Sequence, residues 1–333
     1  MSIDHAAHRH LLDPLRSALR NADLTGVEQA VASLFSTTAN IHLFSPIENQ
    51  LSPQTLATGL WGPLFTALPD LERRDLIVMS GPSDHSDSWV GCCGYYTGTF
   101  SHPYLDIPPT RQVATLRFHE FYEIQNNQGV QMQAVWDLPE LMMQSGVWPL
   151  SPSLGREWHV PGPALQDGLQ TQIRDAAVSQ ASKQLVLDML DGLGKFAESG
   201  VQGMNLEQYW HPHFSWYGPS GIGTARGVEG FRKRHQIPFL NGMPDRVGSG
   251  HAGHLFSDGD FVGFTAWPGT HMTISHDGWL GIAPAQQQIT MRSLDFWRCE
   301  NGLIRENWVL IDLLHVYDQI GVDVLARMRE MTV

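Results

Sequence analysis

One aspartate near the end of the chain is placed where it could do acid/base chemistry. Asp312 closes an apolar stretch, Leu303 to Leu313, whose aromatic and β-branched residues predict a strand. Alternate residues of a strand share a face, so Asp312 is expected on the same face as Trp308 and Leu310. Desolvation in such apolar surroundings would raise the pKa of a carboxyl group towards the range in which it is a useful general base. The residues equally allow Asp312 to cap the helix that is expected to begin near Leu313.

The same aspartate belongs to an internal repeat. A displacement of 175 positions (312 − 137) pairs Asp137 with Asp312. It also pairs further residues of the two halves, among them Pro69 with Pro244, Asp70 with Asp245, Arg117 with Arg292 and Gln144 with Gln319. A repeat of this length indicates two similar domains, because the units of solenoid proteins are far shorter.

Length and composition fit two domains. A chain of 333 residues with 42% hydrophobic content can form two cores. We expect domains at 1–150 and 173–333, the first more diverged. The segment 151–172 between them is rich in Pro and Gly, which predicts an irregular but ordered linker.

Within each copy, helices come first and strands follow. The stretch from Ile173 to Phe196 has apolar residues at helical spacing, and Asp4 to Leu34 is expected to be helical with a break near Ala22 to Gly26. The later part of each copy is rich in aromatic and β-branched residues interrupted by Gly, Pro and Asn. This order predicts an α+β domain, with helices packed on one face of a curved antiparallel sheet whose concave side can hold a ligand.

Composition argues against several classes of protein. The net charge of −13 disfavours nucleic acid as a partner, and no apolar run is long enough to span a bilayer. The first residues lack the apolar core of a secretory signal, and the three Cys form no disulfide framework, so we expect a cytoplasmic protein. The 16 His residues show no spacing typical of a metal site, and we expect no metal.

The second copy resembles a known family through several motifs in a fixed order. These are Gly227-Val-Glu-Gly-Phe231, Met243-Pro244-Asp245, Gly269-Thr270-His271, Gly281-Ile-Ala-Pro284, and a strand pair that leads through Trp308 to Asp312. The stretch from Met204 to Leu325 is similar to the SnoaL-like polyketide cyclases, also called ester cyclases, of the ketosteroid isomerase and nuclear transport factor two superfamily. The first copy resembles them more weakly, since Phe100 replaces the His of the Gly-Thr-His motif and Gln133 stands where Trp308 would be.

The resemblance implies two tandem conical α+β barrel domains, each enclosing a pocket, with no metal or cofactor. In the characterised cyclases an Asp on the last strand is the acid/base group of an intramolecular aldol ring closure, a role that matches Asp312. Such a reaction needs a base and a donor that stabilises the enolate, and His271 is our candidate donor.

The expected pocket has aromatic walls. The candidate substrate-binding residues are Trp216, Tyr217, Trp267, Trp279, Trp308 and Arg292. The aromatic residues could equally be core, and Arg292 could pair with Asp295 or Asp312 or lie in solvent. The pocket of the first copy, marked by Asp137 and Phe100, is expected to be degenerate or to hold a different ligand.

Two classes of function follow from these expectations. One is a cofactor-independent cyclase, isomerase or hydrolase that acts on a small hydrophobic carbonyl compound, with lyase chemistry also open. The other is a non-catalytic protein that binds a small molecule or serves as a scaffold on the same fold. His271 and Asp312 facing one cavity would favour the enzyme, and a salt-bridged Asp312 would favour the binding protein. The two copies are expected to pack as an intramolecular pseudo-dimer, with further homo-oligomerisation left open.

Overall fold

The chain folds into two compact units. The computed structural model describes residues 5–84, 86–169, 172, 174–196, 200, 203–248 and 253–332. The first unit consists of Met1–Leu150, Ala164–Thr171 and Asp323–Val333, and the second of Ser151–Pro163 and Gln172–Val322. The units thus differ from the expected domains in two places: the linker is divided between them, and the last eleven residues (323–333) join the first unit.

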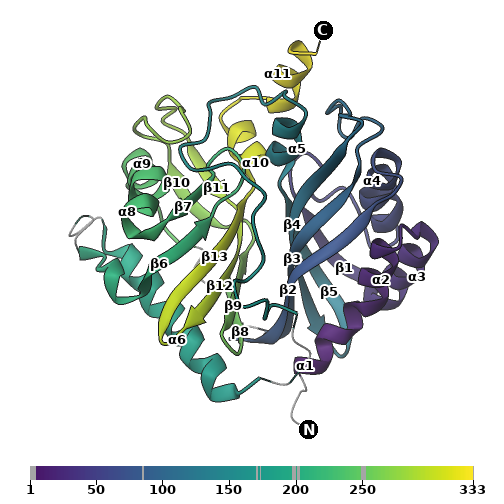
Figure 1. The fold of residues 1–333 in the computed structure, drawn as a ribbon, viewed down its shortest axis with the longest axis horizontal. Helices are drawn as coiled ribbons and strands as arrows, with labels where there is room; N and C mark the ends of the chain where they lie inside the picture. Colours follow the sequence, from purple (N-terminus) through teal and green to yellow (C-terminus); the bar gives the residue numbers. More distant parts are fainter. Residues whose placement is uncertain are drawn as a thin grey trace. The chain divides into compact units, whose positions relative to one another are not determined.

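The first unit is a curved five-stranded sheet with helices on one side (Figure 1). Its elements are α1 (His5–His8), η1 (Arg9–Leu12), α2 (Asp13–Arg20), α3 (Leu24–Leu34), β1 (Phe35–Leu43), the π-helix η2 (Ala57–Trp61), α4 (Gly62–Ala67), β2 (Glu72–Ser83), β3 (Ser86–Thr99), β4 (Val113–Gln125), β5 (Gln128–Trp136), α5 (Leu138–Gln144) and α11 (Val324–Glu330). The strand order is β1-β5-β4-β3-β2. The break between α2 and α3 lies where the sequence predicts it, because Asp23 caps α3 through the Gly26 N–H.

The second unit has a six-stranded sheet and a separate hairpin. Its elements are α6 (Ala176–Gly194), η3 (Leu206–Gln208), β6 (Trp210–Tyr217), β7 (Thr224–Arg226), α8 (Gly227–Phe231), the π-helix η4 (Arg232–Gln236), α9 (Ile237–Gly242), β8 (Gly253–Asp258), β9 (Phe261–Ala266), β10 (Thr270–Thr273), β11 (Gln288–Met291), β12 (Ser293–Glu300), β13 (Leu303–Ile311) and α10 (Leu313–Gln319). The strand order is β7-β6-β13-β12-β9-β8, and β10 pairs with β11 alone. Figure 1 shows α8 and α9 on one side of this sheet.

The α+β class is confirmed, with one correction to the sheets. Each sheet was expected to be antiparallel, but β1 pairs with β5 in parallel and β6 with β13 in parallel. In each unit the helical segment between the first strand and the later meander provides the crossover that a parallel pair needs. The other strand pairs are antiparallel.

Elements of the two units recur at the displacement seen in the sequence. The π-helix η2 corresponds to η4, β5 to β13 and α5 to α10, each 175 positions apart at both ends. Side-chain hydrogen bonds recur as well. The Gln144 amide bonds the backbone of Thr115 at 2.9 and 2.7 Å, and the Gln319 amide bonds that of Thr290 at 2.8 and 2.8 Å. In both units a glutamine therefore ties the last helix of the repeat to a strand.

Among the described residues, none of the helices combines the length and apolar character that a bilayer crossing requires.

Replacing Gln319 tests this tie. We expect Gln319→Ala to lower the free energy of unfolding by about 1 kcal/mol, because both backbone groups of Thr290 lose a partner. The neighbouring exposed Asp318→Ala should change it by less than about 0.5 kcal/mol. Urea unfolding of the full chain measures both, and equal midpoints for the two variants would contradict the role of Gln319.

Candidate functional site

Asp312 is held in the framework of the second unit. Its side chain caps α10, where Oδ1 accepts the His315 N–H at 3.2 Å, and Oδ2 accepts Arg292 Nη1 at 3.2 Å. Only 4% of the residue is exposed. The guanidinium of Arg292 also lies over the Trp267 ring at 4.5 Å. Of the predicted site residues, Asp312, Arg292 and Trp267 are thus brought together, with both carboxylate oxygens in use as acceptors.

The first unit contains the same arrangement. Arg117 Nη2 donates to Asp137 Oδ2 at 3.1 Å, and Asp137 Oδ1 accepts the Glu140 N–H at 3.3 Å. The pairs join the starts of α5 and α10 to the preceding strand pairs, and the two arrangements are 175 positions apart. A pair that occurs in both units is best explained by the fold, so the helix-cap interpretation of Asp312 describes what the side chain does here.

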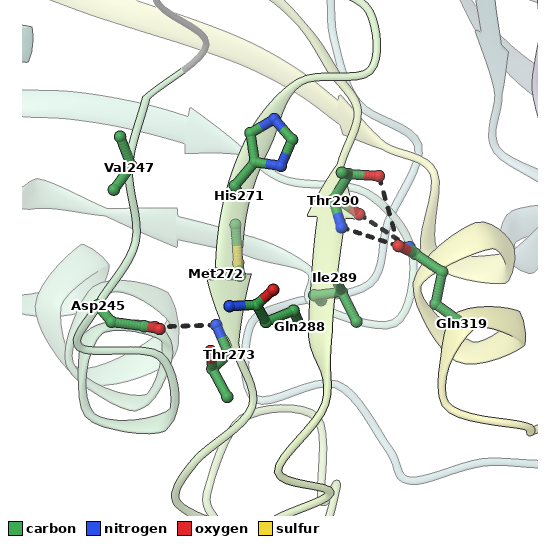
Figure 2. A pocket seen from close by; sticks show the side chains of 9 residues that line it. All are labelled: Asp245, Val247, His271, Met272, Thr273, Gln288, Ile289, Thr290 and Gln319. Carbon is green, nitrogen blue, oxygen red and sulfur yellow. Dashed lines mark hydrogen bonds between the residues drawn. The ribbon is translucent and has the colours of Figure 1, made fainter.

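His271 lies apart from Asp312, on the hairpin. It is exposed on β10, opposite Thr290 of β11. Figure 2 shows it among residues that line a pocket, which also include Asp245, Thr273 and Gln319. This pocket has a volume of ≈ 370 Å³. Within the part of the chain that is described, Asp312 is not one of the residues lining this pocket. Asp312 therefore does not share this hairpin pocket with His271.

The aromatic candidates divide between the two faces of the second sheet. Strand register places Trp216 beside Asn307, and Asn307 beside Trp297, on one face. The His235 ring of η4 stacks on Trp216 at 4.2 Å, so η4 covers this face, which we call the inner face.

Trp308 and Tyr217 lie on the opposite face. Their rings pack at 5.3 Å, and the Trp308 indole N–H donates to the Pro161 carbonyl at 2.9 Å. They therefore pack under the segment 151–163 and do not line the helix-covered side. Trp279, the remaining aromatic candidate, is 3% exposed and meets Phe239 edge-on at 5.6 Å.

The inner face carries an acid that the sequence analysis named only as an alternative partner of Arg292. Asp295 lies on β12, directly opposite Val309 of β13 and Phe264 of β9. Burial raises the pKa of Asp295 to about 8, although a hydrogen bond with Ser293 opposes the shift. Its Oδ1 atom is buried without a hydrogen-bond partner among the described residues, while the residue as a whole is only partly buried. Asp295 is therefore mostly protonated at neutral pH and has a free oxygen.

Glu120 occupies the corresponding position in the first unit and is fully satisfied. It is fully buried on β4 and accepts four hydrogen bonds. The donors are Arg73 Nη1 at 2.7 Å, Tyr96 Oη at 2.7 Å, Tyr122 Oη at 2.8 Å and Trp136 Nε1 at 3.0 Å. With Phe100 also fully buried and Asp137 only 3% exposed, the marked residues of the first unit are packed into its interior.

A histidine faces the inner side of the second unit. Burial lowers the pKa of His235 to about 3, so the imidazole is neutral at ordinary pH. Its Nδ1 atom is buried with no partner in the described chain. The free nitrogen of a neutral imidazole can donate a hydrogen bond to a ligand or accept one from it, depending on the tautomer. Because its pKa is low, His235 is a weak base.

Asp295 and His235 were not among the predicted site residues. One signal in the sequence points to Asp295. The displacement of 175 positions that pairs Asp137 with Asp312 also pairs Glu120 with Asp295. No group of three or more His, Cys, Asp or Glu side chains within the described ranges is placed to hold a metal ion.

The pKa of Asp295 predicts a pH dependence of stability. The folded protein holds a proton on Asp295 up to about pH 8, whereas the carboxyl group ordinarily loses it near 3.8. Stability should therefore fall as the pH rises between these values, by up to about 1.4 kcal/mol per pH unit. Asp295→Asn should remove this part of the slope.

The measurement is urea unfolding at several pH values, always compared with the parent. Glu140, whose pKa burial also raises to about 8, contributes to both proteins and cancels in the difference. The exposed Asp318→Asn serves as the control and should keep the parent slope. An identical slope in Asp295→Asn would show that Asp295 is ionised in the folded protein.

Comparisons with known proteins place the second unit. Residues 199–320 match the family model described as SnoaL-like polyketide cyclase. The chain is similar to IdmH from Streptomyces antibioticus, a proposed polyketide cyclase, with 17% identity over 42% of this chain and 98% of that one and a TM-score of 0.35. It is also similar to AclR from Streptomyces galilaeus, a proposed hydroxylase, with 18% identity, 43% and 98% coverage and a TM-score of 0.35. A third similar structure is TsrD from Streptomyces laurentii, with 14% identity over 43% of this chain and 98% of that one and a TM-score of 0.35. A comparison with curated proteins found no match. Over residues 199–320 the second unit is therefore similar to the SnoaL-like polyketide cyclase family.

Proposed function

We propose that the second unit is a cofactor-independent enzyme of the cyclase or isomerase type, which acts on a small hydrophobic carbonyl compound through Asp295. One observation carries the proposal. Asp295 is a largely protonated acid with an unpartnered oxygen on a helix-covered sheet face, whereas Glu120 at the corresponding position has four donors. A carboxyl group whose pKa is strongly raised by desolvation is a common feature of catalytic sites.

The chemistry follows from the protonated state of Asp295. Its O–H can donate to a substrate carbonyl oxygen, which polarises the carbonyl and stabilises the enol that forms. As the carbonyl oxygen gains the proton of Asp295, a proton leaves the neighbouring carbon, most readily a carbon between two carbonyl groups. Water accepts this proton and returns one to the Asp295 carboxylate, which restores the acid. The enol can then attack a second carbonyl to close a ring or regain its proton elsewhere.

Other groups would support the reaction without taking part in proton transfer. The neutral imidazole of His235 and the indole of Trp297, whose Nε1 is buried without a partner in the described structure, can orient polar atoms of the substrate. Asp312 would hold the end of β13 against Arg292. His271 would lie outside this site, in the hairpin pocket.

We propose further that the two units are tandem SnoaL-like domains with different roles. In the first unit, Glu120 and its donors fill the interior with a satisfied polar cluster. Such a cluster stabilises one packing arrangement and leaves no free acid. The first unit would then be a structural partner of the catalytic one.

A second candidate function is a non-catalytic binding protein, and one observation favours it. The family-like aspartate, Asp312, is salt-bridged and caps a helix. Turnover distinguishes the two candidates, because a binding protein would retain a bound carbonyl compound without exchanging its protons.

The test uses native mass spectrometry to find a co-purifying molecule and proton NMR in D₂O to follow exchange at the activated carbon of cyclic and aryl β-keto esters. We expect the protein to accelerate exchange and Asp295→Asn to lower the rate at least about 100-fold. The rate should also fall as the pH rises through about 8, because the acid form is lost.

The control is Asp318→Asn, an exposed acid on α10 of the same unit, which should keep the parent rate. Binding without any acceleration of exchange would favour the non-catalytic function. Full activity in Asp295→Asn would remove Asp295 from the mechanism.

A further inference from the structure

A groove in the second unit combines apolar walls with one cation. It has a volume of ≈ 240 Å³. Its lining includes Pro152, Leu154, Ile222, Arg234, Trp279 and Leu280. We call it the Arg234 groove. It lies among elements of the second unit and does not include Asp295, His271 or Asp312.

Part of its wall comes from the segment that precedes the family-like region. The Gly155 N–H donates to the Ile222 carbonyl at 2.9 Å, and Arg156 and Thr224 exchange two backbone hydrogen bonds at 2.8 and 2.9 Å. The Trp158 indole donates to Thr224 Oγ1 at 3.0 Å. Residues 155–158 thus extend the β7 edge of the sheet, and this attachment holds Leu154 at the groove.

Arg234 is the cation of the groove and has no counter-ion among the described residues. The two basic residues before it on the π-helix are paired, Arg232 with Glu207 at 2.8 Å and Lys233 with Glu229 at 2.6 Å. Arg234 is exposed, so its guanidinium at the edge of the groove is open to an anion from solution. A guanidinium binds a carboxylate through two parallel hydrogen bonds, and apolar walls strengthen such a pair by excluding water.

A series of rings leads from the groove to the inner face. Trp279 meets Phe239 at 5.6 Å, Phe239 stacks on His235 at 5.3 Å, and His235 stacks on Trp216 at 4.2 Å. The Trp279 Nε1 atom is buried without a partner in the described chain. The groove is therefore connected by packed aromatic side chains to the face that carries Asp295.

We propose that the Arg234 groove binds the carboxylate end of an amphipathic aromatic compound. The carboxylate pairs with Arg234, and the ring packs against Trp279, Ile222 and Leu154. Only one part of the inference rests on the proposed function, namely that the bound compound is the substrate. In that case the substrate is an aromatic carbonyl compound that carries a carboxylate. Binding itself is independent of catalysis.

The test compares two probes that differ in charge, 1-naphthylacetate and 1-naphthylacetamide, by calorimetry on the full chain. We expect the acetate to bind more tightly than the amide, and more weakly as salt is raised. Arg234→Gln should weaken acetate binding about tenfold and leave amide binding unchanged. The matched control is Lys233→Gln on the same helix, which removes a cation that is already paired and should leave both unchanged.

Two further variants separate this inference from the proposed function. Leu154→Glu places a carboxylate beside Arg234 and should abolish acetate binding, and circular dichroism checks that the variant folds. Asp295→Asn should bind the acetate as the parent does, even where proton exchange is lost. Equal affinity for acetate and amide, or acetate binding that survives Arg234→Gln, would overturn the inference.

Discussion

A carboxyl group taken out of water must either be surrounded by donors or keep its proton, and this constraint distinguishes the two units of the chain. Both units place an acid on the same strand of the same sheet face, Glu120 in one and Asp295 in the other. Four donors satisfy Glu120, and the interior of the first unit is closed around it. Asp295 lacks such donors and keeps its proton to about pH 8. The same position therefore holds a fully hydrogen-bonded acid in one unit and an acid with an unpartnered oxygen in the other.

The second constraint is the buried ion pair that closes each sheet. Burying an arginine and an aspartate is costly unless their geometry is good, and removing one partner leaves an uncompensated charge. The pairs Arg117–Asp137 and Arg292–Asp312 both combine the ion contact with a helix cap. Each aspartate accepts one hydrogen bond from a backbone N–H and one from an arginine side chain, and these two bonds fix its position. A carboxylate fixed in this way suits a structural role.

The sequence predicted the architecture better than the site, and the reason is physical. The helix-then-strand order and the repeat displacement depend on local patterns, so the α+β class and the placement of Asp137 and Asp312 at matching positions could be read from residues. Helices cover one face of a strand, and side-chain packing decides which face this is. The alternation of apolar and polar residues along the strand does not reveal it. Both faces of β13 carry apolar side chains, because the segment 151–163 covers Trp308 on one face while η4 covers the other. Alternation alone therefore could not show that Trp308 and Tyr217 lie on the face away from η4, or that Asp295 lies on the face that η4 covers. The sequence also does not show that the strand before His271 ends at Ala266, which places the histidine on the separate β10–β11 hairpin.

The difference between the two acids can be traced to individual substitutions within the repeat. Two donors to Glu120 are Tyr122 and Trp136, and the residues 175 positions later are Trp297 and Ile311. Ile311 has no side-chain donor, and the Trp297 Nε1 atom is buried without a partner in the described chain. Aspartate is also one methylene shorter than glutamate, so Asp295 reaches less far from β12 towards the groups around it. Each change removes stabilisation from a buried carboxylate and favours its protonated form. The side chains at these paired positions thus account for two of the four donors that Glu120 has and Asp295 does not.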